Sequence, residues 1–182
     1  MERDGAPQDE AVLETPRLRL RRWIISDAAF HRRLWSERDP RVPARRRLSP
    51  DGHPTLAELE DAIRRGTGDP PPGLLVAERR QDGTPIGYCG LVPSSLGRTD
   101  EPELAYEFLQ EVWQHGYATE TARAILDHAA ESGYRHLTAT VRSWNSASFR
   151  VLEKLGFSDT GERELDPVHG DSLLWRVSLG AS

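Results

Sequence analysis

Two stretches of this chain carry polar residues at spacings that could do chemistry, and the first is a run with alternating polarity. The sequence ELAYEF over 103–108 alternates with period two, which predicts a strand with Glu103 and Glu107 on one face and apolar side chains on the other. Burying an unpaired carboxylate is costly, so each glutamate needs either a site or a partner. Two interpretations stay open: a glutamate here takes a proton during catalysis, or both are solvated or paired with arginines.

Immediately downstream, the period changes to that of a helix, with an apolar stripe over 118–129 and Gly133 as the closing residue. The first amides of a helix lack partners and carry partial positive charge, which suits them to bind an anion. Small residues at Gly116 and Ala118 would let a diphosphate approach the backbone. Many helices begin after a glycine, so this pattern alone is a weak signal. The candidate cradle consists of Gln114, His115, Gly116, Tyr117, Ala118 and Thr119.

The second stretch, 145–157, predicts another helix followed by a strand. Asn145 and Ser148 are three residues apart, so their side chains project from the same side of the helix start. In one interpretation Asn145 caps the helix and Ser148 only satisfies the first turn. In the other, the Ser148 hydroxyl donates a proton or a hydrogen bond to a leaving group.

Three motifs together resemble a known family. They are T-P-R-L-R-L-R at 15–21, W-x-x-G-Y-A-T-E at 113–120, and N-x-x-S followed by V-L-E-K-L-G-F within 145–157. The chain resembles the GNAT superfamily of acyl-CoA N-acetyltransferases, in particular its RimJ/RimL-like branch, from about Leu13 to Leu179. One departure is Gln114, which stands where that branch usually has another glycine.

The resemblance implies acetyl-CoA as cosubstrate, with its diphosphate on the amides of Gln114–Thr119 and its pantetheine arm near Asn145. It also implies direct attack by an amine, with Glu103 as base, often through water, and Ser148 assisting the departing thiolate. The acceptor stays open between a protein N-terminal α-amine and a small-molecule amine. A non-catalytic acyl-CoA-binding sensor is the alternative, which Gln114 favours and the presence of Glu103, Asn145 and Ser148 disfavours.

Other reactive residues are given structural interpretations. Cys89 lies in a predicted strand without a histidine nearby in sequence, so we expect a small buried side chain and no covalent acetyl-enzyme. Tyr106 and Tyr117 are expected to pack against the sheet. The six histidines show no metal-ligand spacing, so no metal site is predicted. The basic segment 41–47 is either a solvated loop or, by the resemblance, a border of the acceptor site that selects an acidic acceptor or reaches the nucleotide phosphate.

Composition narrows the class of protein. The 182 residues predict a single domain over 12–180 behind a disordered tail, 1–11. A net charge of −5 argues against general nucleic-acid binding, and one cysteine excludes an intrachain disulfide. No apolar run approaches the ~18 residues of a membrane span, and the polar start is unlike a signal peptide. We therefore expect a cytoplasmic protein without membrane or nucleic-acid partners; a homodimer is possible.

The predicted order of elements is βααβββαβαββ, an α/β (α+β) arrangement with helices on both faces of a mixed sheet. The resemblance specifies a GNAT-like, mostly antiparallel sheet of about seven strands. An edge-like first strand is expected around Leu18 and Leu20, and Ser26 or Asp27 is expected to cap the first helix. A capping box is predicted at Thr55–Glu58, and hairpin turns at 81–84 and 166–170.

Overall fold

The computed structural model describes residues 11–66 and 69–180. The predicted tail, 1–11, lies outside the described residues except for Ala11, which opens a strand. The described elements, in chain order, are β1 (Ala11–Glu14), β2 (Leu18–Arg21), η1 (Ile25–Asp27), α1 (Ala28–Ser36), η2 (Ala44–Arg46), α2 (Leu56–Arg65), β3 (Leu74–Arg79), β4 (Pro85–Val92), β5 (Glu103–Phe108), η3 (Gln110–Val112), α3 (Tyr117–Glu131), β6 (His136–Arg142), α4 (Ser146–Lys154), β7 (Ser158–Glu164) and β8 (Ser172–Ser178).

The strands form one mixed sheet in the order β1-β2-β3-β4-β5-β6-β8-β7. All neighbours are antiparallel except β5 and β6, which run parallel. The expected mixed, mostly antiparallel sheet is confirmed, but it has eight strands in the described part of the chain instead of about seven. The missed strand is β1, whose four residues are too few to show a period and which is held by pairing with β2.

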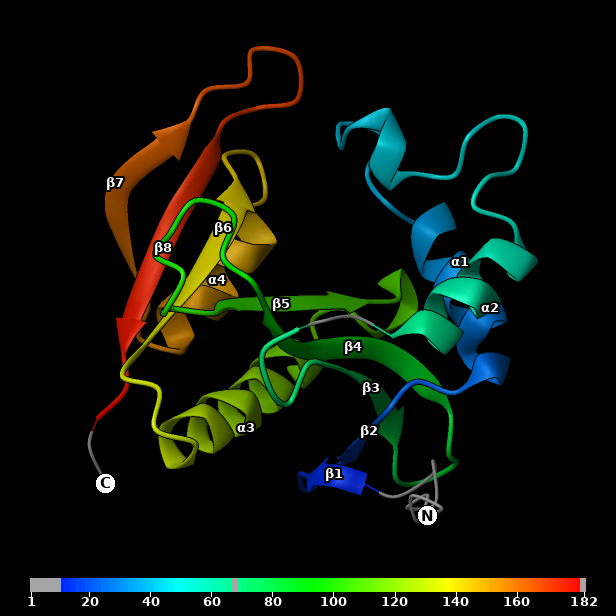
Figure 1. Cartoon of the computed structure of the whole chain (residues 1–182), viewed down its shortest axis with the longest axis horizontal. Helices are drawn as coiled ribbons and strands as arrows, with labels where there is room; N and C mark the ends of the chain where they lie inside the picture. The colour runs from blue at the N-terminus through cyan, green and yellow to red at the C-terminus, as the bar shows by residue number, and fades with distance from the viewer. Residues whose placement is uncertain (1–10, 67–68, 181–182) are drawn as a thin grey trace.

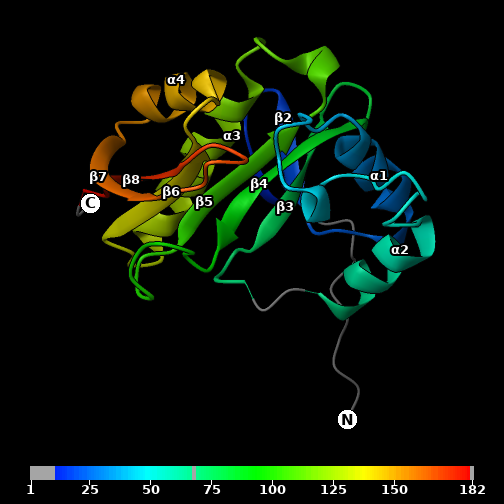
Figure 2. The ribbon, with the colours of Figure 1, turned by 90° about the horizontal axis from the view of Figure 1, so that it is seen from above.

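Helices cover both faces of the sheet, as predicted (Figures 1 and 2). Neighbouring residues of β4 show this, because their side chains point to opposite faces. The Tyr88 ring meets His31 of α1 at a centroid distance of 6.4 Å. On the other face, the Cys89 thiol is hydrogen-bonded to Thr121 of α3. The α1–α2 pair and α3 therefore lie on opposite sides of the central strands.

The core lies mainly between the sheet and α3. The predicted stripe of α3 is confirmed: Ala122, Ile125 and Ala129 are fully buried, and Leu126 is nearly so. The capping box at the start of α2 is also confirmed, with the Glu58 amide donating to Thr55 Oγ1 at 3.3 Å and the Thr55 amide donating to the Glu58 carboxylate at 2.6 Å.

The environment of β2 corrects two predictions. The strand is internal, lying between β1 and β3, and Arg21 is 3% exposed. Its guanidinium donates to Asp27 at 2.8 Å and to Glu78 of β3 at 2.7 Å. Asp27 therefore does not cap α1 with its side chain. These ion pairs let a charged residue occupy a buried strand position, which a polarity pattern alone would place at an edge.

Candidate active site

The two glutamates of β5 share one face, as predicted, but have different surroundings. Glu103 lies where β5 meets β6, opposite Thr138. Its carboxylate accepts hydrogen bonds from the Thr140 hydroxyl at 3.0 Å and from the amide and hydroxyl of Ser95, both at 3.1 Å. Within the described residues no arginine, lysine or histidine forms an ion pair with it. Glu103 is thus a half-buried, negatively charged acceptor oriented by neutral donors.

Glu107, by contrast, belongs to an ion pair. Arg38 Nε and Nη2 donate to its two carboxylate oxygens at 2.7 and 2.6 Å, and the Tyr88 hydroxyl donates at 2.8 Å. Burial, and then the nearby negative charge of Glu107, raises the pKa of Tyr88 well above its ordinary value, so its phenol stays protonated. The arginine-paired interpretation is therefore correct for Glu107.

The loop before α3 carries the residues of the predicted anion cradle. Gln114 and Gly116 both have left-handed conformations, with φ of +65° and +82°. Alternating backbone conformations of this kind turn successive amides toward one side. Gly116 is the N-cap of α3, and no side chain among the described residues caps this helix. The amides of Tyr117, Ala118 and Thr119 therefore have no partner within the helix, because its first backbone bond runs from Glu120 to Gly116.

Position 114 has a left-handed geometry, which is the conformation that glycine adopts most readily. Only glycine adopts such a φ without a steric cost, whereas a side chain at Gln114 is tolerated under strain. The Gln114 side chain is exposed.

Sequence reasoning missed a connection between two of the motifs. Glu120, at the end of G-Y-A-T-E, accepts hydrogen bonds from the Thr15 hydroxyl at 2.6 Å and from Arg17 Nε at 2.7 Å. Arg17 also donates to the His115 carbonyl at 3.0 Å and covers the Tyr117 ring at 4.4 Å. The T-P-R motif thus holds the cradle loop from the side. Both motifs are visible in the sequence, but neither one indicates that its residues contact the other motif in the folded chain.

Two predicted cradle side chains lie beside this arginine. His115 is exposed, and its ring stacks on that of Tyr117 with centroids 6.0 Å apart. The histidine Nδ1 lies 2.8 Å from the Trp113 carbonyl. Tyr117 packs partly against the core, as expected.

The start of α4 places Asn145 and Ser148 side by side. Asn145 Oδ1 accepts a hydrogen bond from the Ser148 amide at 3.2 Å, so the capping interpretation of Asn145 is correct. This bond leaves the two amide protons of Asn145 available to another acceptor. The Tyr106 hydroxyl donates to the Ser148 carbonyl at 3.4 Å and is also hydrogen-bonded to the Ser148 side chain. Tyr106 links α4 to β5.

Cys89 is fully buried, and burial raises the pKa of its thiol to about 12. A thiol in this state is a poor nucleophile, since the thiolate is the reactive form. The surroundings of Cys89 therefore favour the expected role as a small buried side chain. In the part of the chain that the structure describes, no group of three or more His, Cys, Asp or Glu side chains could hold a metal ion.

The basic segment 41–47 is partly neutralised. Arg41 pairs with Asp39 at 2.8 Å and lies over the ring of Trp144, 4.2 Å from its centroid. Arg45 and Arg46 are exposed in the short η2 turn. The segment therefore combines a solvated turn with one arginine that touches the residue before Asn145.

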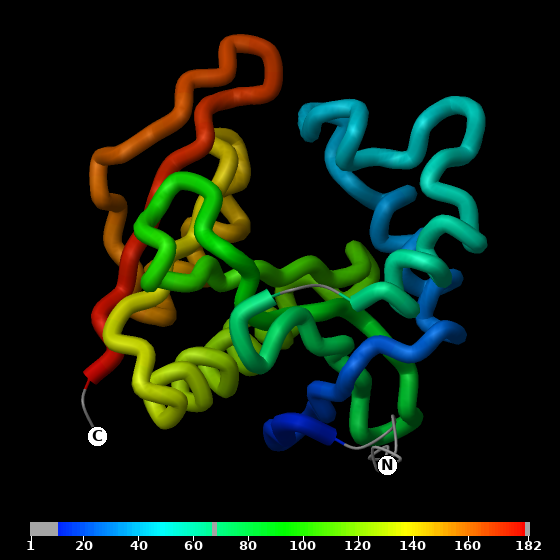
Figure 3. Tube along the Cα trace, viewed as in Figure 1, coloured from blue at the N-terminus to red at the C-terminus, as the bar shows by residue number. Residues whose placement is uncertain are grey.

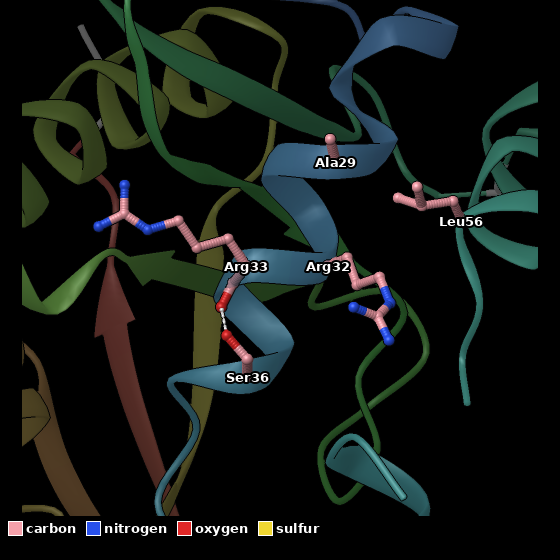
Figure 4. Close-up of a pocket in the computed structure, with 5 residues that line it drawn as sticks. All are labelled: Ala29, Arg32, Arg33, Ser36 and Leu56. Atoms are coloured by element: carbon pink, nitrogen blue, oxygen red, sulfur yellow. Dashed lines mark hydrogen bonds between the residues drawn. The ribbon is translucent and has the colours of Figure 1, made fainter. Parts of the chain in front are cut away.

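A pocket of about 300 Å³ lies elsewhere, lined by residues of α1 and by Leu56 at the start of α2 (Figure 4). Its arginines are already engaged: Arg32 donates to the Gly52 carbonyl at 3.2 Å, and Arg33 pairs with Glu111 at 2.8 Å. None of the predicted site residues lines it. We place the candidate site instead around the β5–β6 junction and the starts of α3 and α4. The pocket is lined by Ala29, Arg32, Arg33, Ser36 and Leu56.

Comparison with known proteins agrees with this geometry. The family model described as an acetyltransferase (GNAT) domain matches residues 17–158, which is more than half of the chain. The chain therefore belongs to the GNAT family of acetyltransferases. Membership implies an acyl-CoA-dependent acyltransferase. None of the helices in the described part of the chain is long and apolar enough to cross a membrane.

Similar proteins support the fold and leave the substrate open. The chain is 38% identical to the uncharacterized protein YkkB of Bacillus subtilis (strain 168) over 84 residues, which span 46% of this chain and about half (49%) of that relative. An acetyltransferase of Bacillus anthracis has a similar structure, with a TM-score of 0.68 at 20% identity, covering 91% of this chain and 96% of that chain.

Two further solved structures are comparable. An acetyltransferase from Agrobacterium tumefaciens str. C58 gives a TM-score of 0.67 at 24% identity and covers 97% of this chain and 99% of that chain. A spermidine N-acetyltransferase chimera from Vibrio cholerae SpeG and hSSAT gives a TM-score of 0.68 at 19% identity. The match covers 89% of this chain and 95% of that chain. At these identities the likeness shows the fold alone.

Proposed function

We propose that this protein is an acetyl-CoA-dependent N-acetyltransferase of the RimJ/RimL-like kind, which transfers an acetyl group directly to a primary amine. The observation that carries the proposal is the start of α3, which no described side chain caps, whose first amides have no partner within the helix, and which follows two left-handed residues, Gln114 and Gly116. A diphosphate accepts hydrogen bonds and carries negative charge, which is what such a helix start binds. The acceptor is a protein N-terminal α-amine or a small-molecule amine.

In this proposal the thioester of acetyl-CoA lies between β5 and β6, near Glu103. An amine attacks only in its neutral form, and amines of proteins and small molecules are mostly protonated near neutral pH. Glu103 accepts the proton, directly or through a water molecule. Its neutral hydrogen-bond partners, Ser95 and Thr140, orient the carboxylate without cancelling its charge.

The remaining steps use groups on β5 and α4. The amine nitrogen forms a bond to the acetyl carbon, and backbone N–H groups of β5 stabilise the oxyanion that develops. The C–S bond then breaks, and the Ser148 hydroxyl donates a hydrogen bond or a proton to the CoA thiolate. Asn145 contacts the pantetheine arm through its amide protons. The products are the acetylated amine and free CoA, with no acyl group left on the protein.

Calorimetry with acetyl-CoA tests the cofactor site. A Cβ at Gly116 would meet only the Arg17 guanidinium, at 3.6 Å, so Gly116→Trp fills the cradle without entering the core. Gly133→Trp is the matched control, because Gly133 also has a positive φ, +90°, at the other end of α3 and has open space around it. We expect binding by wild type and Gly133→Trp and its loss in Gly116→Trp. A wild-type protein that does not bind acetyl-CoA would contradict the proposal.

Release of free thiol separates the enzyme from the alternative, a non-catalytic acyl-CoA-binding sensor. Wild-type protein is mixed with acetyl-CoA and a panel of N-terminal peptides, polyamines and other small amines. Thiol release that depends on an added amine supports the transferase. Tight binding of acetyl-CoA without amine-dependent release across the panel would favour the sensor.

A further inference from the structure

A contact between two segments far apart in the sequence lies directly beside Asn145 and Ser148, the residues proposed to act on the pantetheine arm and the CoA thiolate. Arg41 follows α1, and Trp144 lies in the turn between β6 and α4, next to Asn145. The Arg41 guanidinium lies over the Trp144 ring, 4.2 Å from its centroid, within range of a cation–π interaction. In Figure 3 the segment after α1 (cyan, right) and the β7–β8 loop (orange, left) both rise above the central strands, at opposite ends of the view. The contact therefore joins the two sides of the molecule.

Arg41 does not reach Trp144 as a free side chain. Asp39 accepts hydrogen bonds from the Arg41 backbone amide at 2.8 Å, from Nε at 2.9 Å and from Nη2 at 2.8 Å. The arginine is thus fixed at its backbone and along one edge of its guanidinium group. Fixing both ends lowers the conformational entropy lost when the guanidinium stacks on the ring.

Trp144 is fixed from the opposite side by the β7–β8 loop. Its indole N–H donates to the His169 carbonyl at 2.7 Å. Gly170 has a φ of +82°, and a Cβ there would lie 2.6 Å from Trp144 Cδ1, so the indole occupies the space that a side chain would need. Asp166 shapes this loop by accepting from the amides of Val168 and His169.

The backbone around Trp144 leads straight into α4. The Asn145 amide donates to the Arg142 carbonyl at 2.8 Å, and the Ser146 amide donates to the Trp144 carbonyl at 3.1 Å. Asn145 then caps the helix through the Ser148 amide. The backbone of Trp144 therefore lies directly between the end of β6 and the first turn of α4, which carries Ser148.

We propose that Arg41 and Trp144 form a clasp that positions the start of α4 and couples it to the segment after α1. Arg41 and Trp144 are positioning residues: neither touches the reacting atoms, and both act through Asn145 and Ser148. The effect of the clasp on catalysis rests on the proposed function. The coupling between the segment after α1 and the start of α4 does not. Closure of the clasp holds Ser148 toward the β5–β6 junction. Its release loosens the first turn of α4.

Hydrogen exchange of the full-length protein tests the coupling without any acceptor. Arg41→Ala should raise the exchange of amides in 143–149 by about two- to fivefold, the factor that an exposed cation–π contact supports. Arg45→Ala is the matched control, because Arg45 is an exposed arginine in the same segment and makes no side-chain hydrogen bond or ion pair within the described residues. Unchanged exchange in Arg41→Ala, or an equal rise in Arg45→Ala, would overturn the clasp.

A double-variant experiment asks whether the two residues act through each other. In a Trp144→Ala background, Arg41→Ala should add no further exchange in 143–149. Full additivity of the two effects would contradict the proposal. Arg41→Lys, which keeps the charge but not the planar group, should fall between wild type and Arg41→Ala.

Steady-state kinetics test whether the clasp affects catalysis. With an acceptor from the amine panel, Arg41→Ala should lower kcat about two- to fivefold while the affinity for acetyl-CoA stays within twofold of wild type. Unchanged kcat would overturn the positioning role. If the wild type transfers no acetyl group but Arg41→Ala still raises exchange in 143–149, the proposed function fails and the coupling holds.

Discussion

Arg17 and Glu120, 103 positions apart in the chain, form a salt bridge of 2.6 Å between Nη2 and Oε2. The bridge joins the start of β2 to the first turn of α3, beside the left-handed Gly116. The Glu120 carboxylate also accepts the Arg17 amide at 3.0 Å and the Thr15 hydroxyl at 2.6 Å. One acidic residue of the cradle motif therefore anchors the segment that precedes β2.

Glu120→Gln should destabilise the fold. An amide would face the Arg17 guanidinium with donors where the carboxylate now accepts, and hydrogen bonds to charged groups contribute about 1.5–3 kcal/mol each before solvent screening. Because Arg17 is about half exposed, we expect a loss of about 1–2 kcal/mol in the free energy of unfolding, measured by urea denaturation. Glu131→Gln, an exposed position at the end of α3, is the control. Equal midpoints for the two variants would contradict the assigned role.

Gln114 allows a test of backbone strain. Its φ of +65° is unfavourable for any residue with a Cβ and worst for a β-branched one. Gln114→Val should therefore lower the free energy of unfolding by about 1 kcal/mol or more, whereas Gln114→Gly should be at least as stable as wild type. Thermal unfolding checks both. A valine variant as stable as the glycine variant would show that position 114 is not held in the left-handed region.

Ser148→Ala should lower kcat with little change in the affinity for acetyl-CoA. A positioned proton donor contributes about a hundredfold or more to a rate. Ser146→Ala is the matched control, since Ser146 is an exposed serine two residues earlier in the same helix. Steady-state kinetics and calorimetry on both variants give the two quantities. Turnover of Ser148→Ala at the wild-type rate would remove this hydroxyl from the mechanism.

His31 predicts a pH dependence of stability. Burial, followed by the positive charge of Arg38, lowers the pKa of His31 from 6.5 to about 4. The ring accepts the Trp35 indole N–H at 3.1 Å and lies 4.8 Å from the Trp23 ring. The unfolded chain takes up a proton below pH 6.5, while the folded protein stays neutral until about pH 4. The stability that this histidine confers is therefore complete above pH 6.5 and is lost as the pH falls toward 4.

The difference in unfolding free energy between pH 7 and pH 4 should thus be smaller in His31→Gln than in wild type. The shift corresponds to at most about 3 kcal/mol, at about 1.4 kcal/mol per pKa unit. His115→Gln, at an exposed histidine, serves as the control. Parallel pH profiles for His31→Gln and wild type would show that this histidine does not titrate in that window.

Sequence patterns were reliable where a structure depends on neighbouring residues. The capping box at Thr55 and the apolar stripe of α3 follow from spacings of three and four residues. The hairpin at 81–84 follows from a local turn signal, and the strands on either side have nearly the predicted bounds. Each of these features is stabilised mostly by atoms that are close in the sequence.

Other features depended on partners that no local pattern identifies. Arg21 is buried because Asp27 and Glu78 meet it from two different elements. The two glutamates of β5 look equivalent in the sequence, yet one is oriented by neutral donors and the other is paired with Arg38. The contact of Arg41 with Trp144 spans 103 positions. Only the folded chain brings these charges and rings together.

The parallel pairing of β5 with β6 has a consequence for how the molecule unfolds. The register between these strands consists of a single pair of partners, Glu103 and Thr138, whereas β4–β5 and β6–β8 pair along most of their length. A long ladder opens as one unit, and a single pair is a natural boundary between units. We therefore expect the sheet to open as two blocks, β1–β5 and β6–β8, with the β5–β6 junction near Glu103 as the boundary between them.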